Sequence, residues 1–306
     1  MNKVAVLMSS YNGEKYIREQ IDSILDQQGV EVILFVRDDG SSDGTKDILS
    51  AYETEHANVK VEYAQNVGVA NSFMNLLYSV SNDFDFYAFS DQDDIWEPNK
   101  LSEAVKMLEE KDALLYGSNQ ECVDQAGQHI GMRYATDAKI NMTPIAIVQN
   151  NMIAGCTMVF TSKLYKLLTE EIKRPSQRLL RSRMHDVWAP LVAAVHGGLI
   201  YDTRSFIKYR QHENNVVGAQ ISAKKRRKAI KRKLFNKENR NSRSLTAKEI
   251  CEKFPDEAKK DYLLEVCANA HKLKNKRLLI KNNKLLRSYT GESKTGFIIK
   301  VLLGLY

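Results

Sequence analysis

Residues 84–96 read FDFYAFSDQDDIW. The stretch begins with a mainly apolar run, and the carboxylates Asp91, Asp93 and Asp94 follow it directly. The run up to Phe89 has the length and the aromatic content of a buried strand. Carboxylates this close together repel one another, and a hard cation such as Mg²⁺ or Mn²⁺ that also binds phosphate oxygens would relieve the repulsion. The stretch therefore predicts a metal and diphosphate site at a strand end. A solvated acidic turn that caps the next helix is the alternative.

Strand and helix patterns alternate along the first part of the chain. Short apolar runs alternate with stretches whose apolar residues recur at helical spacing. In chain order, we predict a strand at 4–8, a helix at 14–27, a strand at 32–36, a helix at 46–55, a strand at 59–63, a helix at 69–80 and a strand at 84–89. This order is typical of an α/β fold with a mostly parallel sheet and helices on both faces. Such sheets bind ligands at the carboxyl ends of their strands.

A polar cluster follows each of the four predicted strands. The clusters are Ser9-Ser10-Tyr11-Asn12, Asp38-Asp39, Asn66-Val67-Gly68 and Asp91-Gln92-Asp93-Asp94. Together they could supply what a nucleotide diphosphate requires, namely an aromatic face, a carboxylate for the N–H group of a base, and metal ligands. We expect Tyr11 and Asp39 to serve the base, and Asp91, Asp93 and Asp94 to serve the ribose and the metal. For Asp39, an Asx turn or a helix cap is the alternative.

The composition indicates a large globular protein of a reducing compartment. The chain has 306 residues, of which 43% are apolar, so it can bury one large core or a core with an appendage. The apolar start at 4–8 is too short for a signal peptide, and we expect a cytosolic protein. The cysteines, Cys122, Cys156, Cys251 and Cys267, lack the spacing of a zinc site and are interpreted as structural thiols.

Charge divides the chain into two parts. Residues 1–220 contain 21 Lys and Arg against 30 Asp and Glu, a net charge of −9, whereas residues 221–306 contain 24 against 8, a net charge of +16. We therefore predict an acidic α/β domain at 1–220 and a basic, mainly helical region at 221–306. The basic region begins near the run Lys224-Lys225-Arg226-Arg227-Lys228.

The basic region also has apolar residues at the spacing of amphipathic helices. These patterns occur at 262–270 and 278–286, and residues 297–306 are apolar but too few to span a bilayer. Each basic residue contributes on the order of 1 kcal/mol near anionic lipid, so we predict peripheral attachment to the inner face of the cell membrane. A solvated appendage or a homo-oligomer contact is the alternative. No nucleic-acid partner is expected, because the acidic first part would repel phosphate.

Three motifs, in order, resemble those of family 2 glycosyltransferases with the GT-A (Rossmann-like) fold. They are VAVLMSSYNG at 4–13, RDDGSSDGT at 37–45 and DQDDIW at 91–96, and the resemblance covers about the first 220 residues. Two later segments, HDVW at 185–188 and YRQHENNVVG at 209–218, are most similar to bacterial rhamnosyltransferases of cell-surface polysaccharide synthesis. The resemblance implies transfer of a sugar from a nucleotide diphosphate to a glycan or lipid-linked acceptor.

The resemblance also implies roles in donor binding for residues of the first three clusters. Asp39 would read the base and Tyr11 would pack on it, with Ser9 nearby. Asn66 would contact the donor nucleotide from the third cluster. The sequence leaves open whether the donor contains thymidine or uridine diphosphate, and rhamnose itself rests on the resemblance.

A metal site of several carboxylates is implied in the same way. Asp93 would be the principal ligand of Mn²⁺ or Mg²⁺, and Asp91 and Asp94 would assist at the metal or at the ribose. His212 and Arg210 lie in a segment that returns toward the site in the family, so a metal contact and a diphosphate contact are predicted for them. A loop histidine bonded to the backbone is the alternative for His212.

Asp186 matches the late carboxylate that deprotonates the acceptor hydroxyl in the family. It would be the general base of a single in-line displacement that inverts the anomeric configuration. The alternative is a cap at the start of a helix over 187–195, and both roles can hold together. The neighbouring His185 is expected to be solvated.

The resemblance also implies that a segment of small residues forms the acceptor side of the site. Gly155, within the segment 150–160, would let a sugar approach the backbone closely, although a buried strand with a bulge explains the segment nearly as well. Trp96 and Trp188 could offer faces for a sugar, but large aromatic side chains are more often core residues. A catalytically silent scaffold with a degenerate nucleotide site remains the non-enzymatic alternative.

Overall fold

The computed structural model describes residues 1–183, 185–212 and 241–306, and these residues form two compact units. Of them, 1–139, 153–169 and 198–212 belong to the first unit, and the others belong to the second. The second unit therefore combines residues 140–152 and 170–197 with the basic C-terminal helices. The predicted boundary at 220 and the basic run 224–228 lie outside the described residues, so the division of the chain at 220 stays a prediction.

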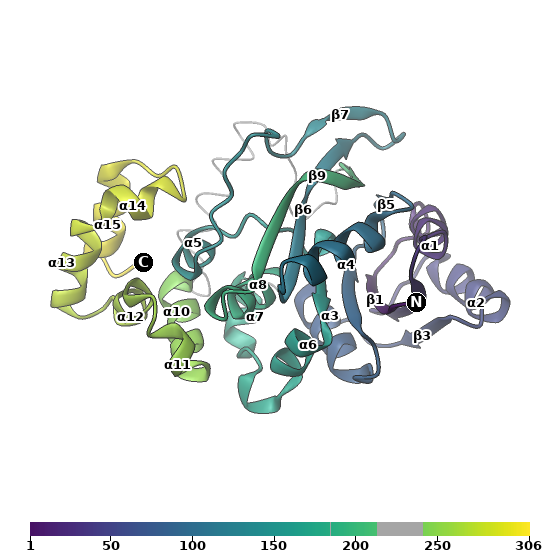
Figure 1. Ribbon diagram of the computed structural model, residues 1–306, viewed down its shortest axis with the longest axis horizontal. Coiled ribbons are helices and arrows are strands. Elements are labelled where there is room, and N and C mark those ends of the chain that lie inside the picture. Colours follow the sequence, from purple (N-terminus) through teal and green to yellow (C-terminus); the bar gives the residue numbers. More distant parts are fainter. Residues whose placement is uncertain (184, 213–240) are drawn as a thin grey trace. The chain divides into compact units, whose positions relative to one another are not determined.

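A nine-stranded sheet forms the centre of the first unit (Figure 1). Its strands are β1 (Lys3–Ser10), β2 (Glu31–Asp38), β3 (Val59–Tyr63), β4 (Phe86–Ser90), β5 (Ile95–Trp96), β6 (Leu115–Val123), β7 (His129–Met132), β8 (Val159–Thr161) and β9 (Leu199–Arg210). Their order is β3-β2-β1-β4-β8-β6-β9-β5, and β7 pairs with β6. The four strands predicted from the sequence, β1 to β4, pair in parallel. The prediction of an α/β fold is confirmed.

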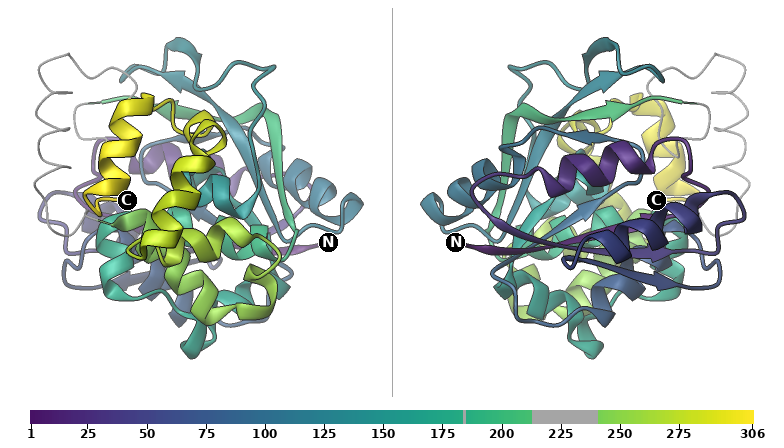
Figure 2. Two further views of the ribbon diagram at one scale, coloured as in Figure 1. Left: turned by 90° about the vertical axis from the view of Figure 1, so that its left-hand side faces the viewer. Right: turned by 90° about the vertical axis from the view of Figure 1, so that its right-hand side faces the viewer.

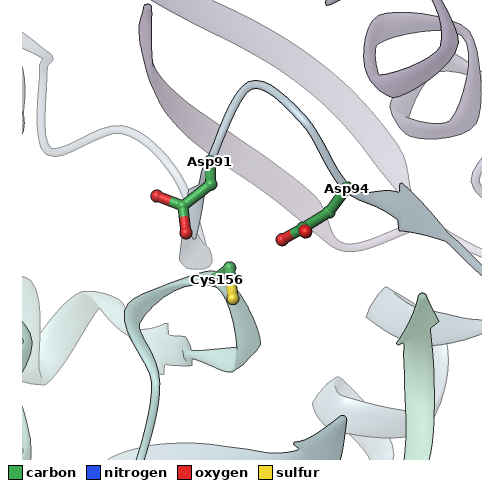
Figure 3. Close-up of side chains that lie close together, drawn as sticks. All are labelled: Asp91, Asp94 and Cys156. Atoms are coloured by element: carbon green, nitrogen blue, oxygen red, sulfur yellow. The ribbon is translucent and has the colours of Figure 1, made fainter. Parts of the chain in front are cut away.

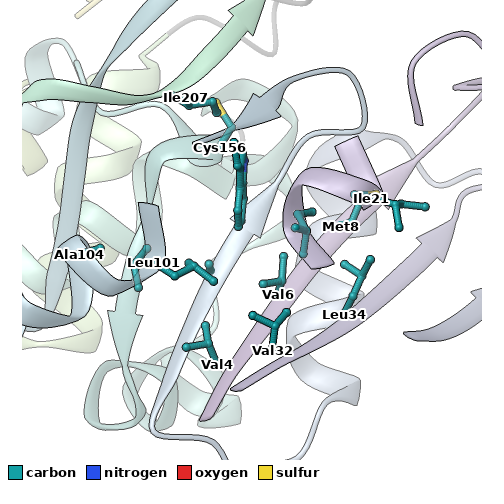
Figure 4. Close-up of a cluster of buried hydrophobic side chains, with 14 of the residues drawn as sticks. Val4, Val6, Met8, Ile21, Val32, Leu34, Leu101, Ala104, Cys156 and Ile207 are labelled. Carbon is teal, nitrogen blue, oxygen red and sulfur yellow. The ribbon is translucent and has the colours of Figure 1, made fainter. Parts of the chain in front are cut away.

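Helices cover both faces of this sheet, as the alternating pattern predicted. They are α1 (Ile17–Leu25), α2 (Thr45–Glu55), α3 (Val69–Ser79), α4 (Lys100–Glu110) and α6 (Ser162–Thr169). Successive side chains of a strand point to opposite faces. Val4 and Val6 of β1 are fully buried in one core with Ile21 of α1 and Leu101 of α4 (Figure 4). This face of the sheet therefore packs against helices that follow β1 and β5.

The opposite face of the sheet packs against helices through pairs of aromatic rings. Tyr87 of β4 stacks on Tyr165 of α6 with ring centroids 4.0 Å apart, and Phe89 meets the edge of Phe73 of α3 at 5.5 Å. All of these rings are buried. Because β4 is buried on both faces, its sequence is a continuous apolar run and does not alternate between apolar and polar residues.

The described part of the second unit is helical. Its helices are α5 (Pro144–Gln149), α7 (Gln177–Arg183), α8 (His185–Val195), α10 (Ser242–Lys253), α11 (Pro255–Ala258), α12 (Tyr262–Ala268), α13 (Leu273–Lys281), α14 (Asn283–Ser288) and α15 (Lys294–Leu302). Within this unit α10 packs against α5, α7 and α12. None of the described helices is both long enough and apolar enough to cross a membrane.

One predicted helix of the basic region is divided in two. The sequence pattern predicted a helix over 278–286, but α13 ends at Lys281 and α14 begins at Asn283. The side chains of Asn282 and Asn283 donate hydrogen bonds to the carbonyls of Leu278 (2.9 Å) and Ile280 (2.7 Å). Such side-chain contacts compete with the helical hydrogen-bond pattern and favour a break.

Candidate donor and metal site

Three polar loops leave the sheet at one edge. β1 pairs in parallel with β2 and with β4, so that Ser10 lies opposite Asp38 and Met8 lies opposite Ser90. The chain continues beyond these positions into the segments that contain Tyr11, Asp39 and the acidic cluster. The parallel order thus brings the predicted donor-binding loops to the same edge of the sheet.

Gln92 joins the loop after β1 to the loop after β4. Its Oε1 accepts hydrogen bonds from Ser10 Oγ and from the Tyr11 backbone N–H, both at 2.9 Å, and its Nε2 donates to the Tyr11 carbonyl at 3.1 Å. A Cβ at Gly13 would lie only 2.3 Å from Oε1, so this approach requires glycine at residue 13. The Tyr11 side chain remains 48% exposed, which leaves an aromatic face at the site. Sequence reasoning gave Gln92 no role.

Asp39 is buried and fixes the loop after β3. Its carboxylate accepts hydrogen bonds from the backbone N–H groups of Val67 (3.1 Å) and Gly68 (3.0 Å), and Arg37 Nη2 lies 3.6 Å away. Asn66 of the same loop is exposed. The Asx-type contact proposed as the alternative for Asp39 is made by Asp38, whose Oδ2 accepts from the Ser41 N–H at 3.0 Å. A contact between Asp39 and a base stays a prediction.

Ser9 is tied to the helix behind the site. Its Oγ donates a hydrogen bond to the Oγ of Ser72 in α3 at 2.7 Å. Ser72 is fully buried, whereas Ser9 is partly exposed. The bond fixes the end of β1 at the edge of the sheet, and the predicted role of Ser9 near the donor is untested.

Asp91, Asp94 and Cys156 form a compact group of potential metal ligands (Figure 3). One ligand atom from each lies within 4.8 Å of the others, and the two carboxylates come from one loop above the thiol. Cys156 belongs to the short 3-10 helix η1 (Gly155–Thr157), which begins at the predicted acceptor residue Gly155. The sequence reading of Cys156 as a structural thiol missed this placement. No local pattern links residue 156 to residues 91–94.

Asp94 is the carboxylate whose surroundings best fit a bound cation. It is 1% exposed, its Oδ1 accepts the Arg210 backbone N–H at 3.1 Å, and its Oδ2 has no hydrogen-bond partner among the described residues. Burial and the charges of Asp93 and Asp91 raise the pKa of Asp94 well above its usual range. A buried oxygen without a partner, beside a second carboxylate, fits a divalent cation.

Asp93 lies next to His212. Asp93 Oδ2 and His212 Nε2 are 2.7 Å apart, and the imidazole stacks on the ring of Tyr16 with centroids 5.4 Å apart. The structure thus brings together two predicted metal ligands that are separated by more than a hundred residues in the sequence. The pair forms either an ion pair or a joint ligand set.

Arg210 is hydrogen-bonded to the acidic loop. Its guanidinium is buried and donates hydrogen bonds to the carbonyls of Asp93 (3.0 Å) and Gln125 (2.9 Å), and it also pairs with the carboxylate of Glu19 in α1. The observed contacts of Arg210 are therefore with the protein itself. Its predicted contact with a diphosphate is untested.

A buried amine lies close to the acidic group. Lys100 is fully buried, and its Nζ is 3.3 Å from the centroid of the Trp96 ring and has no hydrogen-bond partner among the residues that the structure describes. Burial lowers the pKa of Lys100 to about 7, although the nearby charges of Cys156 and Asp94 act in the opposite direction. Trp96 is itself buried, so its ring is a core residue and offers no free face to a sugar.

Asp186 begins a helix of the second unit. It lies in the first turn of α8, is partly exposed, and its backbone carbonyl accepts a hydrogen bond from Asn151 Nδ2 at 2.7 Å. His185 is 3% exposed, and burial lowers its pKa to about 3, so the expectation of a solvated histidine was wrong. Trp188 is 1% exposed and packs near Phe254, which makes it a core residue in this structure.

Comparison with known proteins identifies the family. Residues 5–168 match the sequence pattern described as glycosyl transferase family 2. The chain belongs to this family. It is 30% identical over 242 residues to the dTDP-rhamnosyl transferase RfbG of Shigella flexneri, which covers 76% of this chain and 81% of that protein. It is also 25% identical over 228 residues to an uncharacterized glycosyltransferase of Rickettsia typhi, covering 72% of this chain and 67% of the other.

The fold of this family 2 glycosyltransferase is shared with a solved structure. The crystal structure of S. aureus TarS 1-349 in complex with UDP-GlcNAc superposes with a TM-score of 0.59 at 17% sequence identity, covering 99% of this chain and 93% of that chain. The similarity extends to the fold, and the predicted GT-A class is confirmed. The family assignment also confirms the resemblance that the three motifs indicated.

Asp94 should make the stability of the metal-free glycosyltransferase depend on pH. Because the pKa of Asp94 is raised in the folded state, its contribution to stability is present below the usual range of an aspartate and is lost as pH rises through the raised pKa. With EDTA present, the free energy of unfolding of the wild type relative to Asp94→Asn should fall as pH rises. Mn²⁺ should reverse this fall. Urea unfolding at several pH values measures the difference, and equal pH profiles for the two proteins would contradict the prediction.

Proposed function

We propose that the chain is an inverting, metal-dependent glycosyltransferase that transfers rhamnose from dTDP-rhamnose to a glycan or lipid-linked acceptor of bacterial cell-surface polysaccharide. The proposal of rhamnose is supported by the relative named dTDP-rhamnosyl transferase, of which this chain covers 81%. The observation that carries the catalytic proposal is the group of carboxylates at the edge of the sheet, where Asp94 has a buried oxygen without a partner among the described residues.

The donor nucleotide would bind across the loops after β1, β2 and β3. The exposed ring of Tyr11 would stack on the base, with Ser9 beside it. Asp39 would accept a hydrogen bond from an N–H group of the base with the lone pairs that Val67 and Gly68 leave available, since each carboxylate oxygen can accept more than one hydrogen bond. Hydrogen bonds from both backbone groups hold this carboxylate in one orientation.

Asp93 would be the principal ligand of Mn²⁺ or Mg²⁺, with Asp91, Asp94 and His212 around it. When bound, the ion supplies positive charge to the diphosphate that departs. Arg210 would keep the acidic loop in place through its bond to the Asp93 carbonyl. The stacking of His212 on Tyr16 limits the orientations that its imidazole can take.

Transfer would occur in one displacement. The acceptor hydroxyl oxygen would form a bond to the anomeric carbon, while the bond from that carbon to the diphosphate oxygen breaks and its electron pair leaves with the diphosphate. Asp186 would take the proton of the hydroxyl as the general base. Because attack and departure occur on opposite sides of the carbon, the anomeric configuration would invert. Attachment of the basic region to an anionic membrane would bring a lipid-linked acceptor within reach.

A calorimetric titration of the full chain with four donors tests the proposal. The panel is dTDP-rhamnose, UDP-glucose, UDP-galactose and UDP-N-acetylglucosamine, each with Mn²⁺ and with EDTA. We expect binding of dTDP-rhamnose that requires Mn²⁺ and is lost in Asp93→Ala. The control is Asp137→Asn, which removes an exposed carboxylate outside the site and should bind the donor as the wild type does.

Other outcomes of the titration replace parts of the proposal. Selective binding of a UDP-hexose would reject rhamnose and keep the transferase site. Binding that is equal in Mn²⁺ and EDTA would reject metal dependence. If none of the donors binds even in the presence of oligosaccharide acceptor fragments, a scaffold with a degenerate nucleotide site becomes the better explanation.

A further inference from the structure

Helix α15 has apolar side chains on two sides. Phe297 and Val301 are buried within the second unit, at 0% and 1% exposure. Ile299, Leu302 and Leu303, which recur at helical spacing, are 49%, 56% and 67% exposed. A surface helix normally has a polar outer side, and a helix that is apolar all round requires a second cover. The outer side of α15 therefore exposes apolar side chains along most of its length, and its exposed polar residues, Lys294 and Thr295, lie at its beginning.

Helix α13 extends this apolar surface. Leu273, in its first turn, is 77% exposed. Lys276, one turn later on the same side, donates a hydrogen bond from Nζ to the Leu302 carbonyl at 2.8 Å, which brings the beginning of α13 to the end of α15. Figure 2 shows the two helices next to each other in yellow and yellow-green. We define Leu273, Ile299, Leu302 and Leu303 as the docking face.

The segment that contains the docking face is strongly basic. Residues 271–306 contain nine Lys and Arg and a single acidic residue, Glu292. Glu292 is already paired with Arg243 (2.6 Å) and Lys300 (3.0 Å). The exposed basic residues of this segment are Lys272, Lys274, Arg277, Lys281, Lys284 and Lys294.

We infer that the docking face seats on an anionic lipid bilayer, with the four apolar side chains among the acyl chains and the surrounding lysines and arginines on the phosphate headgroups. This inference rests on the proposed membrane attachment and names the residues that make it. Apolar residues with a basic border are typical of helices that lie in the plane of a membrane. The nine residues of α15 are too few to cross one.

The charges disfavour two other covers that the chain itself could provide. A second copy of this surface would bring two positively charged borders together. The run Lys224-Lys225-Arg226-Arg227-Lys228 is equally basic and would be repelled in the same way. An acidic protein partner has compatible charge, and the experiment below separates it from lipid.

Flotation of the full chain with lipid vesicles tests the inference. One set of vesicles is phosphatidylcholine alone and the other contains about 30 mol% phosphatidylglycerol, so that surface charge is the variable. The wild type should float only with the anionic vesicles and should be released as salt rises from about 0.1 to 0.5 M. The double variant Leu302→Ser, Leu303→Ser should bind at least about tenfold more weakly, because two leucines lose their apolar contact with lipid.

Two controls separate membrane binding from folding and from catalysis. Ile130→Ser removes an exposed apolar side chain of β7 in the first unit and should float as the wild type does. The donor titration is repeated on the double variant, where unchanged donor affinity with lost flotation would assign the defect to the docking face alone. If the wild type itself bound none of the donors, the transferase proposal would be rejected, and the flotation result would still stand.

Three results would overturn the inference. Flotation of the double variant at the wild-type level would assign membrane binding to another part of the chain, such as the run 224–228. No flotation of the wild type with anionic vesicles would exclude the bilayer and favour an acidic protein. A dimer in light scattering that the double variant loses would identify a second copy as the occupant.

Discussion

Asp186→Asn should lower the rate of sugar transfer by a factor of about 10³ while donor affinity stays at the wild-type level, because asparagine cannot take a proton from the acceptor hydroxyl. Single-turnover transfer and donor calorimetry measure the two quantities. Glu171→Gln, which neutralises an exposed acidic residue of the same unit, is the matched control and should retain full activity.

Asparagine also separates the base role of Asp186 from its structural role. In the first turn of α8, an aspartate stabilises the helix mainly through the helix dipole, which contributes about 0.5 kcal/mol at such a position. If Asp186 served only as a helix cap, Asp186→Asn would lower the stability of the protein slightly and most of the rate of sugar transfer would remain. Wild-type transfer by Asp186→Asn, with unchanged donor binding, would show that another group accepts the proton.

Arg210→Met should lower the free energy of unfolding by about 3 kcal/mol and weaken metal-dependent donor binding at the same time, because it removes a buried charge and leaves the carbonyls of Asp93 and Gln125 without their donor. Urea unfolding and donor calorimetry are the measurements. Arg210→Lys should restore only part of the loss, since an ammonium group lacks the planar set of five N–H donors.

Lys208→Met provides a control on the same strand. Lys208 pairs with Glu97 at 3.5 Å, and both side chains are about two-fifths exposed. An exposed ion pair of this kind contributes less than about 1 kcal/mol, so the variant should remain near the wild type in stability and donor binding. If Arg210→Met and Lys208→Met had equal effects, the anchoring role of Arg210 would be rejected.

The first four strands could be predicted from the sequence because their signal is local. Each is a short apolar run followed by polar residues, and the alternation with helices determined the parallel order. The placement of Asp39 and Asp91 at one edge of the sheet then followed from topology, without knowledge of any side-chain contact. Family membership could be predicted for the same reason, because each of the three motifs is a local stretch of sequence at the end of a strand.

Contacts between distant segments could not be predicted in this way. Cys156 reaches the acidic cluster through η1 and the antiparallel strand β8, and neither the predicted acceptor segment at 150–160 nor its alternative, a buried strand with a bulge, separated these two elements. The burial of His185 and of Trp188 depends on helices that pack together only in three dimensions. The break at Asn282 did have a local signal, two adjacent asparagines, which the apolar spacing around them outweighed in the prediction.

The two tryptophans of the chain are divided between its two units. Trp96 lies against the Nζ of Lys100 in the first unit, and Trp188 is buried beside Phe254 in the second. Each unit therefore contains one tryptophan, which becomes exposed to water only when that unit opens. A pair of single-tryptophan proteins, made by Trp96→Phe and Trp188→Phe, would report separately on each half of the molecule, so that the melting of either half could be followed by emission wavelength without an added label.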